Sequence, residues 1–132
     1  MNQCENCFAN ILSLIDTLQR NAEDNIECDN SCTRGFLGNT NGLICLNTRP
    51  ITLYHCDNSL FEIPYQTNEG TTLTSSVFRV KNIKGNCITV TILAPNPTPT
   101  DLIPYVSTNQ TATINLDCVC ALKCLRDTTI NI

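Results

Sequence analysis

The sequence predicts a mainly β protein: a small antiparallel β-sandwich that follows one N-terminal amphipathic α-helix and precedes a cysteine-rich C-terminal segment. About seven short, β-branched runs separated by turn residues lie between residues 43 and 117, as is typical of small sandwiches. Apolar residues at spacings of three and four near the start predict the helix. A chain of 132 residues is long enough to bury a core as a single domain, so its ten cysteines exceed what folding requires.

The helix is expected over residues 3–22, where Asn2 and Glu5 form a start that resembles a capping box. Its apolar stripe has a first row, Cys4, Cys7, Ile11, Leu14 and Leu18, at alternating spacings of three and four, and a second row, Phe8, Leu12 and Ile15, widens the same stripe. Two interpretations follow from this pattern. Either the helix lies on its own domain, or its apolar face pairs with another subunit.

Four cysteines near the N-terminus have spacings that suit a metal or redox site. Cys4 and Cys7 form a C-x-x-C in the first helical turn, but no strand precedes the motif as in thioredoxin-like sites, which disfavours an oxidoreductase. Cys28 and Cys32 follow in a polar connection, residues 23–42. Together the four thiols could hold zinc in a tetrahedral site. The alternative is a disulfide tether between the helix and the connection.

Strands of the sandwich are expected at residues 43–46, 51–56, 60–63, 77–83, 87–93, 102–106 and 112–116. The clearest pair is a hairpin, because residues 77–83 and 87–93 are β-branched runs around a turn that contains Gly85. The proline-rich stretch 95–99 interrupts regular structure. The sandwich therefore spans residues 43–117.

Residues 113–125 begin as a strand-like alternation and then place three thiols within seven residues. Cys118 and Cys120 share a face if the strand continues, because side chains repeat every second residue. Cys120 and Cys124 share a face if the chain turns helical. In either conformation the C-terminal segment, residues 118–132, presents a cluster of thiols.

Composition excludes several classes of function. A formal net charge of −4 without a basic run argues against nucleic acid as a partner. The chain shows no signal peptide and no apolar run long enough to span a membrane, so no membrane contact is expected. No cofactor motif or catalytic residues stand out, although a thiol enzyme that uses the single histidine, His55, stays open as an alternative. Charged residues make up only 15% of the chain, which permits self-association.

Several segments match the pattern of one known family. They are Cys28 to Cys32 (C-x-x-S-C), residues 50–54 with Phe61-Glu62 (IPFxLY…PFE), Phe78-Arg79-Val80 followed by Cys87 (FRV…C), and Thr113 to Leu125 (TVDLxCFCAIQCL). With these segments the sequence resembles the CotY/CotZ family of spore coat proteins, which includes the exosporium protein ExsY. Cys45 and Cys56 are not positions of the family pattern, and Thr111 stands where relatives carry a cysteine.

The resemblance implies a structural protein and not an enzyme. It implies synthesis in the mother-cell cytoplasm without a signal peptide, and assembly in the spore coat or exosporium with copies of itself and with other coat proteins. Family members form ordered arrays that become locked by intermolecular disulfides, as a lattice, a tube or a filament. In such an array, the Thr-rich hairpin 77–93 is expected to offer a sheet edge for strand addition between subunits.

The cysteines are then expected to divide into three groups. Cys4, Cys7, Cys118, Cys120 and Cys124 lie in terminal segments and are expected to bond to neighbouring subunits. Cys28 and Cys32 are expected to tie their connection to the body or to a neighbour. Cys87 opens a core strand and is expected to be a buried thiol, whereas no role is assigned to Cys45 or Cys56.

Overall fold

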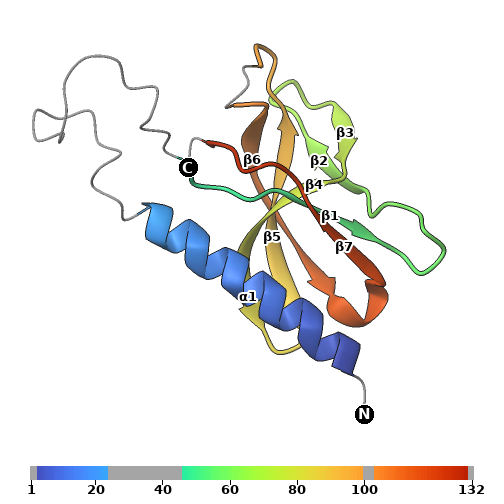
Figure 1. The fold of residues 1–132 in the computed structure, drawn as a ribbon. Helices are drawn as coiled ribbons and strands as arrows, with labels where there is room; N and C mark the ends of the chain where they lie inside the picture. The colour runs from blue at the N-terminus through green and yellow to red at the C-terminus, as the bar shows by residue number, and fades with distance from the viewer. Residues whose placement is uncertain (1–2, 24–45, 100–102, 131–132) are drawn as a thin grey trace, which may run out of the picture.

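The structure, a computed structural model, describes residues 3–23, 46–99 and 103–130 (Figure 1). In order along the chain its elements are α1 (Gln3–Glu23), β1 (Ile51–Tyr54), β2 (Ile63–Gln66), β3 (Thr72–Ser75), β4 (Val77–Lys84), β5 (Cys87–Pro95), β6 (Tyr105–Asn115), the short 3-10 helix η2 (Leu116–Cys118) and β7 (Ala121–Cys124). The prediction of a mainly β, antiparallel fold with one N-terminal helix is confirmed. Within the described ranges, no helix is long and apolar enough to cross a membrane.

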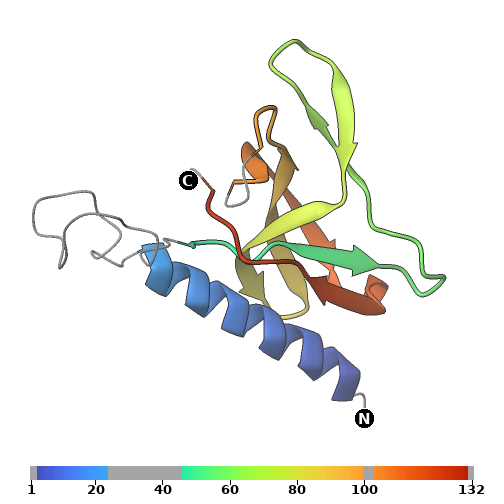
Figure 2. The same cartoon turned by 45° about the horizontal axis from the view of Figure 1, so that its top comes forward.

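Five strands form one antiparallel sheet in the order β6-β5-β4-β1-β7, and β2 pairs with β3 in a separate two-stranded sheet. Figure 2 shows the β2–β3 hairpin standing away from the main sheet. β4 and β5 each have a neighbouring strand on both sides, so the expectation that hairpin 77–93 offers a free edge is wrong. Both strands are central because their apolar residues fill the core. The edges of the main sheet are β6 and β7.

α1 packs on the main sheet through its second apolar row. Leu12 and Ile15 are almost completely buried and belong to the same core as Val80 of β4. Gln19 fixes the helix further, because its Nε2 donates to the Val80 carbonyl at 2.9 Å and its Oε1 accepts from the N–H of Arg49 at 3.0 Å. Each buried leucine or isoleucine contributes roughly 2 kcal/mol to stability. The helix therefore lies on its own domain.

The first apolar row of α1 faces outward. Ile11, Leu14 and Leu18 are 42%, 58% and 42% exposed, and Cys7 in the same row is an exposed thiol. Spacings of four, three and four residues align these side chains on one side of the helix. We call these four residues the outer row.

Some strands differ from the sequence prediction. β6 is one continuous strand where two were expected, because its polar middle, residues 107–111, pairs with β5 despite lacking an apolar pattern. A register shift lies beside Leu93, and Asn109 on β6 has a φ of 60°. β3 was not expected at all, since three of its four residues are exposed. Of the strand expected at 43–46 only Leu46 is described, and it is not in a strand; the connection 23–42 lies outside the described residues apart from its first residue.

Candidate cross-linking site

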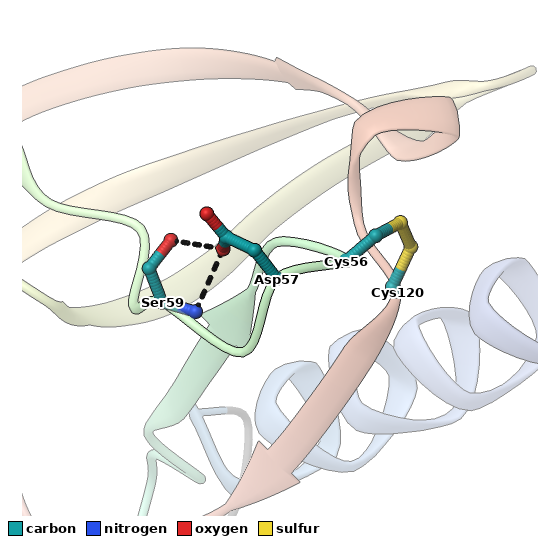
Figure 3. Close-up of a disulfide and its surroundings, with 4 residues drawn as sticks. All are labelled: Cys56, Asp57, Ser59 and Cys120. Atoms are coloured by element: carbon teal, nitrogen blue, oxygen red, sulfur yellow. Dashed lines mark hydrogen bonds between the residues drawn. A yellow bond between two sulfur atoms is a disulfide. The ribbon is translucent and has the colours of Figure 1, made fainter.

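A disulfide joins Cys56 to Cys120 within the chain (Figure 3). Cys56 follows β1 and Cys120 precedes β7, and these two strands pair with Tyr54 opposite Ala121. The N–H of Cys120 donates to the Tyr54 carbonyl at 2.9 Å. The strand register thus places the two Cα atoms 4.9 Å apart, within the range that a disulfide requires.

This bridge differs from the sequence expectation for Cys120, which placed it in a bond to another subunit. Sequence reasoning also left Cys56 without a role, because the family pattern has no cysteine there. The missing information was β7: without a strand at residues 121–124, nothing shows that Cys120 lies beside the end of β1. Had residues 121–124 been recognised as a strand that pairs with β1, the positions of Cys56 and Cys120 just beyond the ends of the two strands would have predicted the bridge.

A tight turn holds Cys56 at the surface. The hydroxyl of Ser59 donates to Asp57 Oδ1 at 2.6 Å and the Ser59 N–H donates to the same oxygen at 2.9 Å (Figure 3). These hydrogen bonds, the hydroxyl's first, hold the pKa of the Asp57 carboxyl below its usual value. The His55 ring stacks on Phe61 with 3.9 Å between centroids. The side chains of His55, Asp57 and Ser59 beside Cys56 therefore make their contacts within this turn region.

Four described cysteines are unpaired and exposed: Cys7, Cys87, Cys118 and Cys124. The expectation of a buried Cys87 is wrong, because β5 points its even-numbered residues Ile88, Val90 and Ile92 into the core and Cys87 away from it. Cys124 lies opposite Ile51 at the far end of β7 from the bridge. Unlike the bridged pair, these four thiols are accessible to another molecule.

Three sulfur positions gather at one end of the main sheet. Cys87 pairs with Asn115, three residues before Cys118, and Cys118 is two residues from the bridged Cys120. A chain spans at most about 3.6 Å per residue, so Cys118 lies within about 7 Å of Cys120 along the backbone. We call Cys87, Cys118 and the Cys56–Cys120 bridge the thiol end. α1 contacts η2 beside it, with the N-terminal end of the helix on that side (Figure 1).

The comparisons with known proteins decide the family. The model of the spore coat protein Z family matches residues 1–127. This chain belongs to the spore coat protein Z family. The comparisons with curated proteins and with solved structures gave no match. The thiol end is therefore a feature of a structural protein of the spore coat.

Hydrogen bonds and an ion pair hold the C-terminal segment of this coat protein against the residues just before β1. Arg49 donates two hydrogen bonds to Asp127, from Nε at 2.7 Å and from Nη2 at 3.0 Å. Thr48 and Thr128 exchange backbone hydrogen bonds at 2.8 and 3.1 Å. Cys118 and Cys124, which the sequence placed in a terminal segment able to reach a neighbour, therefore lie on η2 and on the edge strand β7, and a neighbouring subunit must dock beside them.

The thiols of the alternative zinc site are outside what the structure describes. Cys28 and Cys32 lie among residues 24–45, as does Cys45, and the side chain of Cys4 is not described either. Within the described part of the chain, no group of three or more histidine, cysteine or acidic side chains could hold a metal ion. The zinc site of Cys4, Cys7, Cys28 and Cys32 stays a prediction, as do the cross-linking roles of Cys4, Cys28 and Cys32.

Proposed function

We propose that this coat protein assembles with copies of itself into ordered arrays of the spore coat or exosporium, which intermolecular disulfides then lock. The observation that carries the proposal is the set of four unpaired, exposed thiols on a body that already has its own buried core. Thiols that only filled space would be buried, because free cysteine behaves as a small apolar side chain. Other coat proteins with accessible thiols are further partners of the same chemistry.

Docking precedes cross-linking in this mechanism. A disulfide needs two Cα atoms about 4.4–6.8 Å apart with their side chains aimed at each other, so subunits must already be in register. Each bond then forms when two thiols lose two protons and pass two electrons to an oxidant in the compartment. The reaction therefore waits until the surroundings become oxidising.

The outer row of α1 is a docking surface that suits a second copy of the chain. Ile11, Leu14 and Leu18 would lose contact with water against the same row of another subunit, as in paired helices with a spacing of three and four. Cys7 continues this row and is exposed, so a pair of such helices would carry a thiol on each side of the contact. Apolar docking and cross-linking thus converge on one face.

The sheet edges provide a second kind of contact. β7 carries Cys124 and exposes three of its four residues, and its outer edge has no strand partner in the described residues. An unpaired edge is a template for strand addition. Contacts between unlike surfaces propagate into open arrays, whereas contacts between like surfaces close into pairs. A combination of the two kinds builds an extended layer.

The test compares gels run with and without reductant and images the same samples by negative-stain electron microscopy. Wild type is expected to form ordered assemblies that oxidation makes resistant to detergent, and that separate when reductant and denaturant are added together. A variant with serine at positions 7, 87, 118 and 124 should assemble with much reduced detergent resistance, and further serines at positions 4, 28 and 32 should abolish it. The matched control, C56S/C120S, should keep covalent cross-links. Monomer alone on non-reducing gels, with no assemblies in the micrographs, would contradict the proposal.

A further inference from the structure

A pocket of about 420 Å³ lies between the C-terminal half of α1 and strands β4, β5 and β6. Asp16, Gln19 and Arg20 contribute from the helix, and Arg79 and Lys81 from β4. The rest of the wall consists of Ile130 near the C-terminus and of hydroxyl and amide side chains of β5 and β6, namely Thr91, Ser107, Asn109 and Thr111. Its size is that of a site for a small ligand or for the tip of a peptide segment.

The pocket is positive although the chain as a whole is negative. Its lining holds three cationic side chains and one carboxylate, while the chain has a net charge of −4. Arg79 is buried and engaged within its own subunit, since its Nε donates to Thr48 Oγ1 at 2.9 Å. Asp16 is already occupied by Arg20, with Nε 3.1 Å from Oδ2. Lys81 is exposed and makes no ion pair within the described residues. The pocket therefore favours an anionic group that the surrounding hydroxyls can also bind.

Some carboxylates of this chain already have hydrogen-bond partners within their own subunit, whereas others could bind in such a pocket. Asp57 accepts hydrogen bonds from Ser59, and Asp127 is paired with Arg49. Among the acidic side chains that the structure describes, three lie outside the pocket and make no hydrogen bond or ion pair: Glu62, Glu69 and Asp117. Of these three, Glu69 is the residue at the end of a projecting element.

Glu69 lies at the tip of the β2–β3 hairpin, which stands away from the main sheet (Figure 2). The tip is a closed turn, because the N–H of Thr67 donates to the Thr71 carbonyl at 2.8 Å and the N–H of Gly70 donates to the Thr67 carbonyl at 3.0 Å. Gly70 has a φ of 84°, a conformation that glycine adopts without strain. Two hydrogen bonds hold the base of this turn to β6, because Gln110 Oε1 accepts from the Gln66 N–H at 3.0 Å and Gln110 Nε2 donates to the Gln66 carbonyl at 2.7 Å. The hairpin thus presents an exposed carboxylate on a preformed, anchored turn.

We propose that the basic pocket of one subunit binds the Glu69 carboxylate at the hairpin tip of a second copy of the chain. This inference rests on the proposed self-assembly and identifies one contact within it. Pocket and hairpin tip are different surfaces, so the contact is heterologous and leaves a free hairpin tip and a free pocket at the two ends of every oligomer. It therefore extends an array instead of closing a dimer. Because the attraction is between charges, added salt weakens it.

The test uses two charge-reversed variants under reducing conditions, where no disulfide contributes. R20E/K81E gives the pocket an excess of negative charge, and E69K reverses the charge of the hairpin tip. Each variant alone is expected to lower the association constant, measured by sedimentation and light scattering, by about tenfold or more, since like charges then face each other. An equimolar mixture of the two variants should regain assembly, because each hairpin tip then meets a pocket of opposite charge. Recovery on mixing requires a contact between subunits.

Matched controls separate this contact from general charge effects. K84E/R126E makes the same change of charge at exposed residues outside the pocket, and E62K reverses an exposed carboxylate outside the hairpin tip. Both controls should assemble as wild type does, and circular dichroism should show all variants folded.

If the reversed pocket loses assembly while E69K does not, the occupant is another anion and the proposal is overturned. If wild type assembles and neither variant changes it, the pocket contact is wrong and the proposed function stands. If wild type does not assemble, both are wrong.

Discussion

Cys56 and Cys120 fasten the edge strand β7 to its neighbour β1 just beyond the last paired residues, Tyr54 and Ala121. β7 has only one strand partner in the described residues, so it depends on this bridge more than a central strand would. The two cysteines are 64 residues apart in the sequence, and cross-linking a segment of that length restricts the unfolded chain strongly. The bridge therefore stabilises the edge strand β7.

Cys56→Ser should lower the free energy of unfolding by about 2–4 kcal/mol, because the unfolded chain regains the entropy that the closed loop removed. Chemical denaturation without reductant measures the change. C120S should have the same effect, and the double variant should be no worse than either single variant, since all three lack the same bond. Equal stability of wild type and C56S in the absence of reductant would show that the bridge does not form.

The ion pair between Arg49 and Asp127 makes stability depend on pH. The Arg49 guanidinium, through its hydrogen bonds, holds the pKa of the Asp127 carboxyl below the usual value of about 3.9. Its stabilisation is therefore fully present above that value and is lost as pH falls through the lowered pKa. Both side chains are 36% exposed, so D127N should cost only about 0.5–1 kcal/mol at neutral pH.

Urea unfolding of wild type and D127N between pH 7 and pH 2 tests this sign. The difference between the two proteins should shrink at the acid end and should also shrink in high salt. The control is D117N, which removes an exposed carboxylate that has no ion pair in the described part of the chain. A difference that grows as the pH falls would contradict the assignment.

At the scale of the elements, α1 has two apolar rows with two different tasks. Leu12 and Ile15 join the helix to the core, whereas Leu14 and its neighbours in the outer row stay exposed. Both rows have helical spacing, so periodicity alone predicted the helix but not which row would be buried. The buried row continues to Gln19, whose hydrogen bonds to Val80 of β4 and to Arg49, just before β1, fix the rotation of the helix.

Substitutions in the two rows should therefore separate folding from assembly. Leu12→Ala removes packed atoms from the core and should lower the free energy of unfolding by about 2–4 kcal/mol. Leu14→Asp should leave the melting temperature nearly unchanged and reduce assembly, because a charge would enter the contact between outer rows. S13D, which adds the same charge at an exposed residue outside that row, should assemble normally. Normal assembly of L14D would exclude the outer row as a docking surface.

The same distinction explains how much of the fold was predictable. β1, β4 and β5 were predicted because burial on the core face leaves an apolar pattern in the sequence. β3 and the middle of β6 were missed because hydrogen bonds to a neighbouring strand hold them, and such bonds need no particular side chains. The thiol end depends on the register of β7 against β1, which is a relation between distant segments. A single sequence identified its cysteines but not their pairing.

At the scale of the whole molecule, the four exposed thiols make cross-linking depend on docking. Cys87 and Cys118 lie at the thiol end, Cys7 lies on the outer row, and Cys124 lies at the other end of β7. Thiols spread over several surfaces in this way do not join two freely diffusing molecules efficiently, because few collisions align both side chains. Docking raises their effective concentration and fixes their geometry.

Oxidation should therefore yield covalent oligomers only above the concentration at which the reduced protein assembles. Samples of the reduced protein across a dilution series are oxidised briefly, quenched by alkylation and run on non-reducing gels, while light scattering of matched samples locates the assembly threshold. The two transitions should coincide, and L14D should shift both to higher concentration. Protein unfolded in urea should cross-link in proportion to its concentration, without a threshold. Cross-linking of the folded protein well below its assembly threshold would mean that chance collisions join the thiols, and that docking does not direct the bonds.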